Sequence, residues 1–186
     1  MSRSLKAHVL LVLVTFVWGA TFVVIKQALD DISPLLFNSV RMTLAAVCLL
    51  ALYWKDVCAI GRAVFLDGAL VGAFMWLGYA FQTTGLRLTT PSKSGFLTGV
   101  SVVLVPVFLA MFWKRPSNRW SVIGVAAAFV GLVLMTVPSG AGALADWSSV
   151  NTGDLLTLAC AVAYTFHIIF LGRATKRHRF EPIAFL

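Results

Sequence analysis

The sequence predicts an all-α polytopic membrane protein with six transmembrane helices. Hydrophobic residues make up 60% of the 186 residues, charged residues only 12%, and the mean hydropathy is +0.91. Soluble domains contain about a quarter charged residues. The apolar residues form runs about 20 residues long, which is enough to cross about 30 Å of hydrocarbon. The net charge of +8 comes from short basic clusters between these runs, so it does not indicate a nucleic-acid partner.

The six apolar runs are predicted to be the six spans. They lie near residues 8–29, 34–54, 67–86, 94–113, 120–137 and 154–172. The first run is longer than the apolar core of a signal peptide, which has about 7–15 residues, so we expect it to remain as a helix. Trp54, Trp113 and Trp120 fall at the ends of runs, where their amphipathic rings suit the membrane interface.

Basic residues predict the orientation of these spans. They gather at alternate ends of the runs, and therefore on one side of the membrane: Arg3, Lys6, Lys55, Arg62, Lys114, Arg115, Arg119, Arg173, Lys176, Arg177 and Arg179. Short loops that carry positive charge stay in the cytoplasm. We therefore expect a cytoplasmic N-terminus, with Asp30, Asp31, Asp146 and Asp154 toward the opposite side.

The fourth run has two distinct faces when it is read at 100° per residue. One face carries the hydroxyl groups of Ser94, Thr98 and Ser101. The other, about 120° round, carries Gly95, Gly99 and Pro106. Small residues let two membrane helices approach closely. The second face is thus a candidate for helix packing and the first for a water-filled path, although Gly-x-x-x-Gly is also common in ordinary membrane helices.

Arg41 is the clearest single candidate for solute binding. It lies about two turns inside the second run, where a cation at full depth costs at least about 2.5 kcal/mol. It should therefore face a cavity, protein or an anionic group, or else extend to the interface and hold neighbouring carbonyls. Trp18 and Gly19 share a face of the first run with Lys26, whose side chain is expected to reach the outer interface.

Further candidates come from the third and sixth runs. Trp76 and Tyr79, with Gln82 to one side, suit a pocket for a small organic solute, although both aromatic rings could equally serve packing. Tyr164 and His167 share a face of the sixth run. His167 could carry a proton near neutral pH, or it could be a hydrogen-bonded structural residue.

A segment rich in Gly, Ala and Ser lies between the fifth and sixth apolar runs and divides the chain into two predicted repeats. Residues 1–138 would form five spans, residues 139–152 an extracytoplasmic linker, and residues 153–186 the incomplete start of a second copy. A faint match supports this division. Thr21-Phe22 and the later Pro34-Leu35-Leu36-Phe37 recur as Thr165-Phe166 and Pro182-Ile183-Ala184-Phe185. A repeat with an odd number of spans must place its second copy upside down, as in many secondary transporters.

Several of these residues together resemble EamA-type transporters of the drug/metabolite transporter superfamily. They are Trp18-Gly19-Ala20-Thr21-Phe22, Pro34 with Phe37 and Arg41, Ser94-Gly95-Phe96-Leu97-Thr98 with Pro106, and Trp120 with Gly124 and Gly131. The resemblance implies ten helices in two inverted repeats that move small metabolites across the bacterial inner membrane. It departs from the family at Lys114-Arg115-Pro116, where members often carry an acidic residue.

These observations favour export of small metabolites or amino-acid-like solutes by alternating access. The chain stops at Leu186 inside an apolar stretch, so we expect a fragment of a ten-helix protein, or a chain that pairs with another copy. A membrane fragment or assembly partner that transports nothing is the alternative. We expect the lipid bilayer and a small solute as partners, with no cofactor and no metal.

An enzyme is not expected. The sequence has no His-Glu-x-x-His segment, no Asp pair inside a span and no Gly-x-Ser-x-Gly element beside Ser94, Ser101 or His167. It also has no nucleotide-binding glycine loop ending in Lys-Ser/Thr. Asp and Glu are absent from the interior of the runs, so a carboxylate proton relay has no candidate here.

Overall fold

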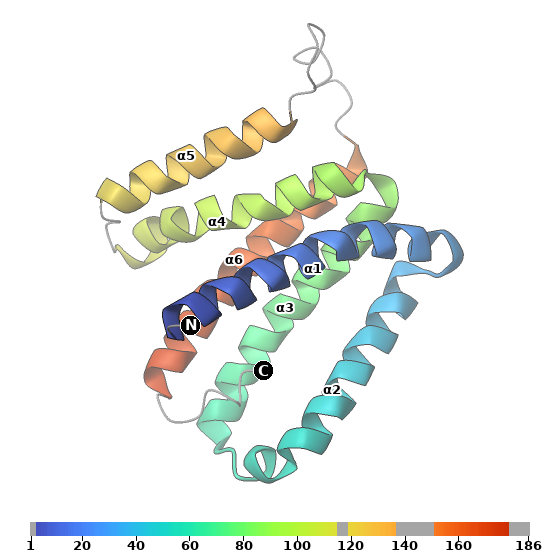
Figure 1. The fold of residues 1–186 in the computed structure, drawn as a ribbon. Helices are drawn as coiled ribbons and strands as arrows, with labels where there is room; N and C mark the ends of the chain where they lie inside the picture. The colour runs from blue at the N-terminus through green and yellow to red at the C-terminus, as the bar shows by residue number, and fades with distance from the viewer. Residues whose placement is uncertain (1–2, 115–118, 137–150, 179–186) are drawn as a thin grey trace, which may run out of the picture.

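The computed structural model describes residues 3–114, 119–136 and 151–178, and these form six α-helices (Figure 1). The helices are α1 (Arg3–Asp31), α2 (Pro34–Cys58), α3 (Arg62–Leu88), α4 (Pro91–Trp113), α5 (Arg119–Thr136) and α6 (Thr152–Arg177). The all-α class is confirmed for the described residues. Most of the predicted linker, residues 139–150, and the last part of the second repeat lie outside them.

Local sequence signals explain where three of the helices begin. Ser33 and Thr90 each accept a hydrogen bond from the backbone N–H three residues later, and a proline follows each of them at the first helical position. Asn151 forms a reciprocal capping box with Asp154 at the start of α6. These caps satisfy N–H groups that a helix cannot satisfy internally, and proline loses nothing at a position where its missing N–H is not needed.

Five helices have the length and hydropathy needed to cross a membrane: α1 from Ala7, α2, α3, α4 and α6. They correspond to the first four and the last of the predicted spans. The helix α3 begins at Arg62, before the predicted start at residue 67. The helix α4 begins at Pro91, before the predicted start at residue 94, because Thr90 caps it there. The 18-residue helix α5 is not one of the five, and its role as a span stays a prediction.

The helix α6 packs against α3 and α4, so a segment late in the sequence lies beside the middle of the chain (Figure 1). The helix α1 contacts both α3 and α4, α2 contacts α3, and α5 contacts α4. Much of α1 and α2 presents large apolar side chains outward, including Phe16 at 76% and Leu52 at 75% exposure. Such surfaces are stable in contact with lipid chains, as expected for a membrane protein.

Glycines allow the close contact between α3 and α6. A Cβ atom on Gly85 would lie 2.7 Å from the carbonyl oxygen of Gly153, and a Cβ on Gly153 would lie 2.6 Å from that of Gly85. About two turns earlier on α3, a Cβ on Gly78 would lie 2.5 Å from the ring of Tyr164. Small residues of this kind let two helix backbones come together where lipid supplies no hydrophobic driving force.

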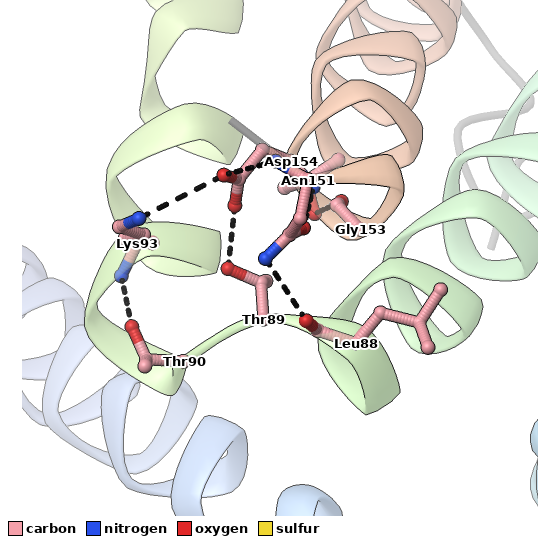
Figure 2. Close-up of polar contacts among 8 residues, drawn as sticks. Leu88, Thr89, Thr90, Lys93, Asn151, Gly153 and Asp154 are labelled. Carbon is pink, nitrogen blue, oxygen red and sulfur yellow. Dashed lines mark hydrogen bonds and ion pairs between the residues drawn. The ribbon is translucent and has the colours of Figure 1, made fainter. Parts of the chain in front are cut away.

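Polar contacts hold the start of α6 against the α3–α4 turn (Figure 2). The hydroxyl of Thr89 donates to Asp154, whose second carboxylate oxygen lies 3.8 Å from the Lys93 ammonium group. The side-chain amide of Asn151 donates to the carbonyl oxygen of Leu88 at 3.1 Å. Asp154 is buried at 8% exposure, so these partners offset the cost of removing its charge from water.

We expect Gly85→Ala to destabilise the fold, because backbone atoms that meet the new methyl group cannot move aside cheaply. Overpacking of this kind costs about 1–3 kcal/mol. Gly72→Ala is the matched control on the same helix, since a Cβ there meets nothing within 4 Å. Unfolding by sodium dodecyl sulfate in mixed micelles, followed by circular dichroism, measures the free energy of unfolding of both variants. Equal free energies of unfolding for the two variants would contradict the close α3–α6 contact.

Candidate solute pathway

A cavity of about 180 Å³ lies between α1, α2 and α3. It is lined by Trp18, Thr21, Phe22, Ile25, Arg41, Tyr79, Gln82, Thr83 and Leu86. None of these nine side chains is acidic, and Arg41 is the one cation among them. The lining therefore combines apolar and aromatic walls with a few polar groups, as is usual for small-molecule sites.

The guanidinium group of Arg41 is held in place by two aromatic rings and one amide. Its central carbon lies 4.2 Å from the ring centroid of Tyr79 and 5.5 Å from that of Phe37. One of its terminal nitrogens donates to the side-chain oxygen of Asn38 at 3.2 Å. Its Nε atom is buried and has no hydrogen-bond partner among the residues that the structure describes. Arg41 thus keeps donor capacity for another group beside an aromatic face that favours cations.

Asn38 connects α2 to α3 through both ends of its amide. Its oxygen accepts hydrogen bonds from Arg41 and from the hydroxyl of Thr83, the latter at 3.1 Å. Its nitrogen donates to the carbonyl oxygen of Tyr79 at 3.1 Å. This residue is buried at 4% exposure, where an amide without partners is costly. Asn38 therefore fixes Arg41 and the cavity-facing turn of α3 together.

A second set of polar contacts connects Gln82, in the cavity wall, to α4 and α6. The amide nitrogen of Gln82 donates to the hydroxyl of Thr98 at 3.2 Å, and the hydroxyl of Tyr164 donates to the Gln82 oxygen over 3.5 Å. Thr98 in turn donates to the backbone carbonyl of Ser94 at 2.8 Å. Tyr164 also meets Tyr79 edge-to-face, with ring centroids 5.7 Å apart. The groups that line the cavity are thus connected to two further side chains, Thr98 on α4 and Tyr164 on α6.

The structure brings together four of the predicted pathway residues at the cavity: Trp18, Arg41, Tyr79 and Gln82. Thr98 and Tyr164 lie behind this wall, where Gln82 donates to the first and accepts from the second. Ser94 is fully buried, and its hydroxyl has no hydrogen-bond partner among the described residues. Assignment of these residues to a transport path stays a prediction.

The other predicted pathway residues lie away from the cavity. Trp76 is 53% exposed and does not line it. His167 places Nδ1 3.0 Å from the carbonyl oxygen of Val71, which can only accept, so this nitrogen carries the hydrogen. That contact fits the structural alternative for His167. Gly19 is exposed and does not line the cavity.

The predicted packing face of α4 is only partly enclosed. Gly99 and Pro106 are half-buried, and a Cβ built on Gly95 meets nothing within 4 Å. Close helix contact at Gly95 and Gly99 therefore stays a prediction, whereas the close contacts in the structure involve Gly78, Gly85 and Gly153. Lys26 donates to the carbonyl oxygens of Leu86 and Arg87 at the end of α3.

The predicted pathway set did not include Asn38, Thr83 and the α1 residues Thr21, Phe22 and Ile25. A signal for Asn38 was available, because an amide one turn from Arg41 in a membrane helix needs partners of its own. The signal for Thr83 was its position on the same face of the third run as Trp76 and Tyr79. Its importance depends on which helix lies opposite.

Residues 5–137 match the model of the EamA-like transporter family. The chain belongs to this family. Similarity to known proteins extends further along the sequence. An uncharacterized transporter from Archaeoglobus fulgidus is 35% identical over 98% of this chain and 54% of its own length. The Escherichia coli K12 protein YedA, named an uncharacterized inner membrane transporter, is 24% identical over 86% of the chain and 51% of itself. No solved structure matches the chain significantly.

Membership of the EamA-like transporter family, together with five helices long and apolar enough to cross a membrane, identifies this chain as a multi-pass membrane protein. The Bacillus subtilis protein YoaV, named an uncharacterized transporter, is 25% identical over 84% of the chain and 54% of itself. The chain thus spans about half the length of the curated relatives that it matches. The cavity beside Arg41 belongs to the family-matched segment.

We expect Asn38→Leu to lower the free energy of unfolding by about 1–2 kcal/mol, because Arg41, Thr83 and the Tyr79 carbonyl lose a buried partner. The neighbouring Ser39→Ala is the matched control. Ser39 is exposed, and its hydroxyl bonds only to Leu35 of its own helix. Detergent unfolding monitored by circular dichroism compares the two. If both variants unfold like the parent, the Asn38 contacts do not stabilise the bundle.

Proposed function

We propose that this chain supplies one half of an alternating-access transporter that exports small organic solutes carrying a carboxylate, such as amino-acid-like metabolites. Arg41 would bind the carboxylate, while Trp18 and Phe22 would contact the apolar part of the solute. The observation that supports this most directly is the half-buried guanidinium group of Arg41 at the wall of a cavity, with a buried Nε that has no hydrogen-bond partner among the described residues.

Electrostatics favour an anionic group beside Arg41. A cation inside the membrane is costly unless an opposite charge, a carbonyl group or water compensates it. Asn38 supplies one neutral acceptor, and no acidic side chain lines the cavity. Charge-assisted hydrogen bonds to a carboxylate are about twice as strong as neutral ones, and the guanidinium fork matches carboxylate geometry. A carboxylate in the cavity would thus supply the opposite charge that the lining residues lack.

The size of the cavity favours a small solute. Its volume of about 180 Å³ equals about six waters at about 30 Å³ each. Cavities for drug-sized ligands are usually about 300–1,000 Å³. The relatives are about twice as long as this chain. In the proposed transporter, a second, inverted repeat would complete the site near the middle of the membrane and rock against the first.

Counterflow in proteoliposomes tests this proposal, with the full product of the reading frame that contains this chain. The probe is a mixture of ¹⁴C-labelled amino acids, and a second arm uses the corresponding amines, which lack the carboxylate. We expect flux of the amino acids only. Arg41→Gln should lower this flux by on the order of tenfold or more, because about 1.5–3 kcal/mol of charge-assisted hydrogen bonding is lost.

Arg41→Lys separates charge from geometry, because lysine keeps the charge but loses the planar fork. We expect intermediate flux from it. The control is Lys55→Gln in the last turn of the same helix, an exposed cation that does not line the cavity. Unchanged flux in Arg41→Gln would contradict the role of Arg41. Equal flux of amines and amino acids would contradict recognition of the solute through its carboxylate. A difference in flux between inside-out and right-side-out vesicles would give the direction of transport.

A further inference from the structure

A second, larger hollow lies at the other end of the bundle. Its volume is about 840 Å³, and it is formed by the start of α3, the second half of α4 and the second half of α6. None of its lining residues lines the cavity beside Arg41. Its volume falls within the range usual for ligand sites, about 300–1,000 Å³. The hollow is therefore a separate candidate binding site.

The walls of this hollow change character along the helix axis. Toward the middle of the bundle they are apolar, with Val105 and Leu109 one turn apart on α4 and Ile168 on α6. Toward the helix ends they carry Trp113 and three cations, Arg173, Lys176 and Arg177. Apolar walls that lead to a basic rim match the order of parts in a phospholipid, with its acyl chains in the hydrocarbon and its phosphate at the interface.

The cations at the rim differ in how they are paired. Arg177 lies 3.3 Å from a carboxylate oxygen of Asp67, which the ring of His178 approaches to 2.8 Å. Arg173 is positioned 5.0 Å from the ring centroid of Trp113. Lys176 has no ion pair with another described residue, and Asp67 is the one acidic side chain among the lining residues. Three cations against one carboxylate leave the rim positive.

We propose that this hollow, a groove open along the bundle surface, binds an anionic phospholipid. The phosphate would lie between Arg173 and Lys176, and one acyl chain would follow the apolar wall past Gly172. A basic pocket between membrane helices is a recognised type of site for anionic headgroups. Free phosphate would leave the long apolar wall uncovered, which is why we assign the lipid. This proposal does not depend on the transported solute.

Gly172 provides a way to test the position of the acyl chain. It lines the groove, and a Cβ at this residue would meet no atom within 4 Å. A larger side chain would therefore extend into the groove without a collision with the protein backbone. Gly172→Leu should fill the place assigned to the acyl chain, whereas Gly172→Ala should leave most of it open.

Native mass spectrometry measures lipid retention directly. The purified full product of the reading frame is titrated with dioleoyl phosphatidylglycerol or dioleoyl phosphatidylcholine, which differ in headgroup charge. We expect a preference for phosphatidylglycerol on the order of tenfold, because each basic residue near the membrane surface attracts anionic lipid. Arg173→Gln with Lys176→Gln should abolish the preference. Gly172→Leu should lower retention of both lipids, and circular dichroism verifies that the variants fold.

The control for charge is Lys55→Gln with Arg62→Gln. These exposed cations end α2 and begin α3, beside the same α3 start that forms the groove, but they do not line it. The preference should persist in this variant. Equal retention of both lipids by the parent would overturn the proposal, as would equal loss in the control. Undiminished retention in Gly172→Leu, or full competition by glycerophosphoglycerol without acyl chains, would also overturn it.

Discussion

The close contact between α3 and α6 is the constraint on which the rest of the bundle depends. In lipid, apolar side chains gain little by moving from acyl chains to another helix, so association relies on close packing and hydrogen bonds. Gly85 and Gly153 bring the two backbones together, and Gly78 leaves room for the ring of Tyr164. Only at this separation can Tyr164 reach Gln82 and Tyr79. The support of the cavity wall by Tyr164 thus depends on three positions that lack a side chain.

Polar groups then determine how the remaining helices lie against this pair. Asn38 joins α2 to α3, Gln82 joins α3 to α4, and Lys26 of α1 caps the end of α3. Each of these groups would be costly without a partner in a medium that contains no water. Their partners belong to other helices, so the same contacts that satisfy them also select one arrangement. Arg41 and Ser94 are exceptions, since the Nε atom of the first and the hydroxyl of the second have no hydrogen-bond partner among the described residues.

Two cavities with positive charge therefore have different physical settings. Beside Arg41, one guanidinium group is enclosed by aromatic rings and an amide, so its attraction for an anion is weakly screened. In the hollow formed by α3, α4 and α6, three cations lie at the helix ends, and only Arg177 among them pairs with the one carboxylate. The first setting suits selection of a small charged solute. The second suits retention of an amphipathic lipid at the interface.

The sequence by itself determined the all-α membrane class, the approximate helix positions and the family resemblance, because hydrocarbon thickness sets the length of apolar runs. It also indicated Arg41, since a cation inside such a run requires an explanation. Tertiary structure decided the pairing of Asn38 with Thr83, 45 residues apart, and the glycines at which helices meet. The sequence pointed to Gly95 and Gly99 for that role. Glycines recur on several helix faces, and which face meets a neighbour depends on helix rotation and register, which local sequence does not specify.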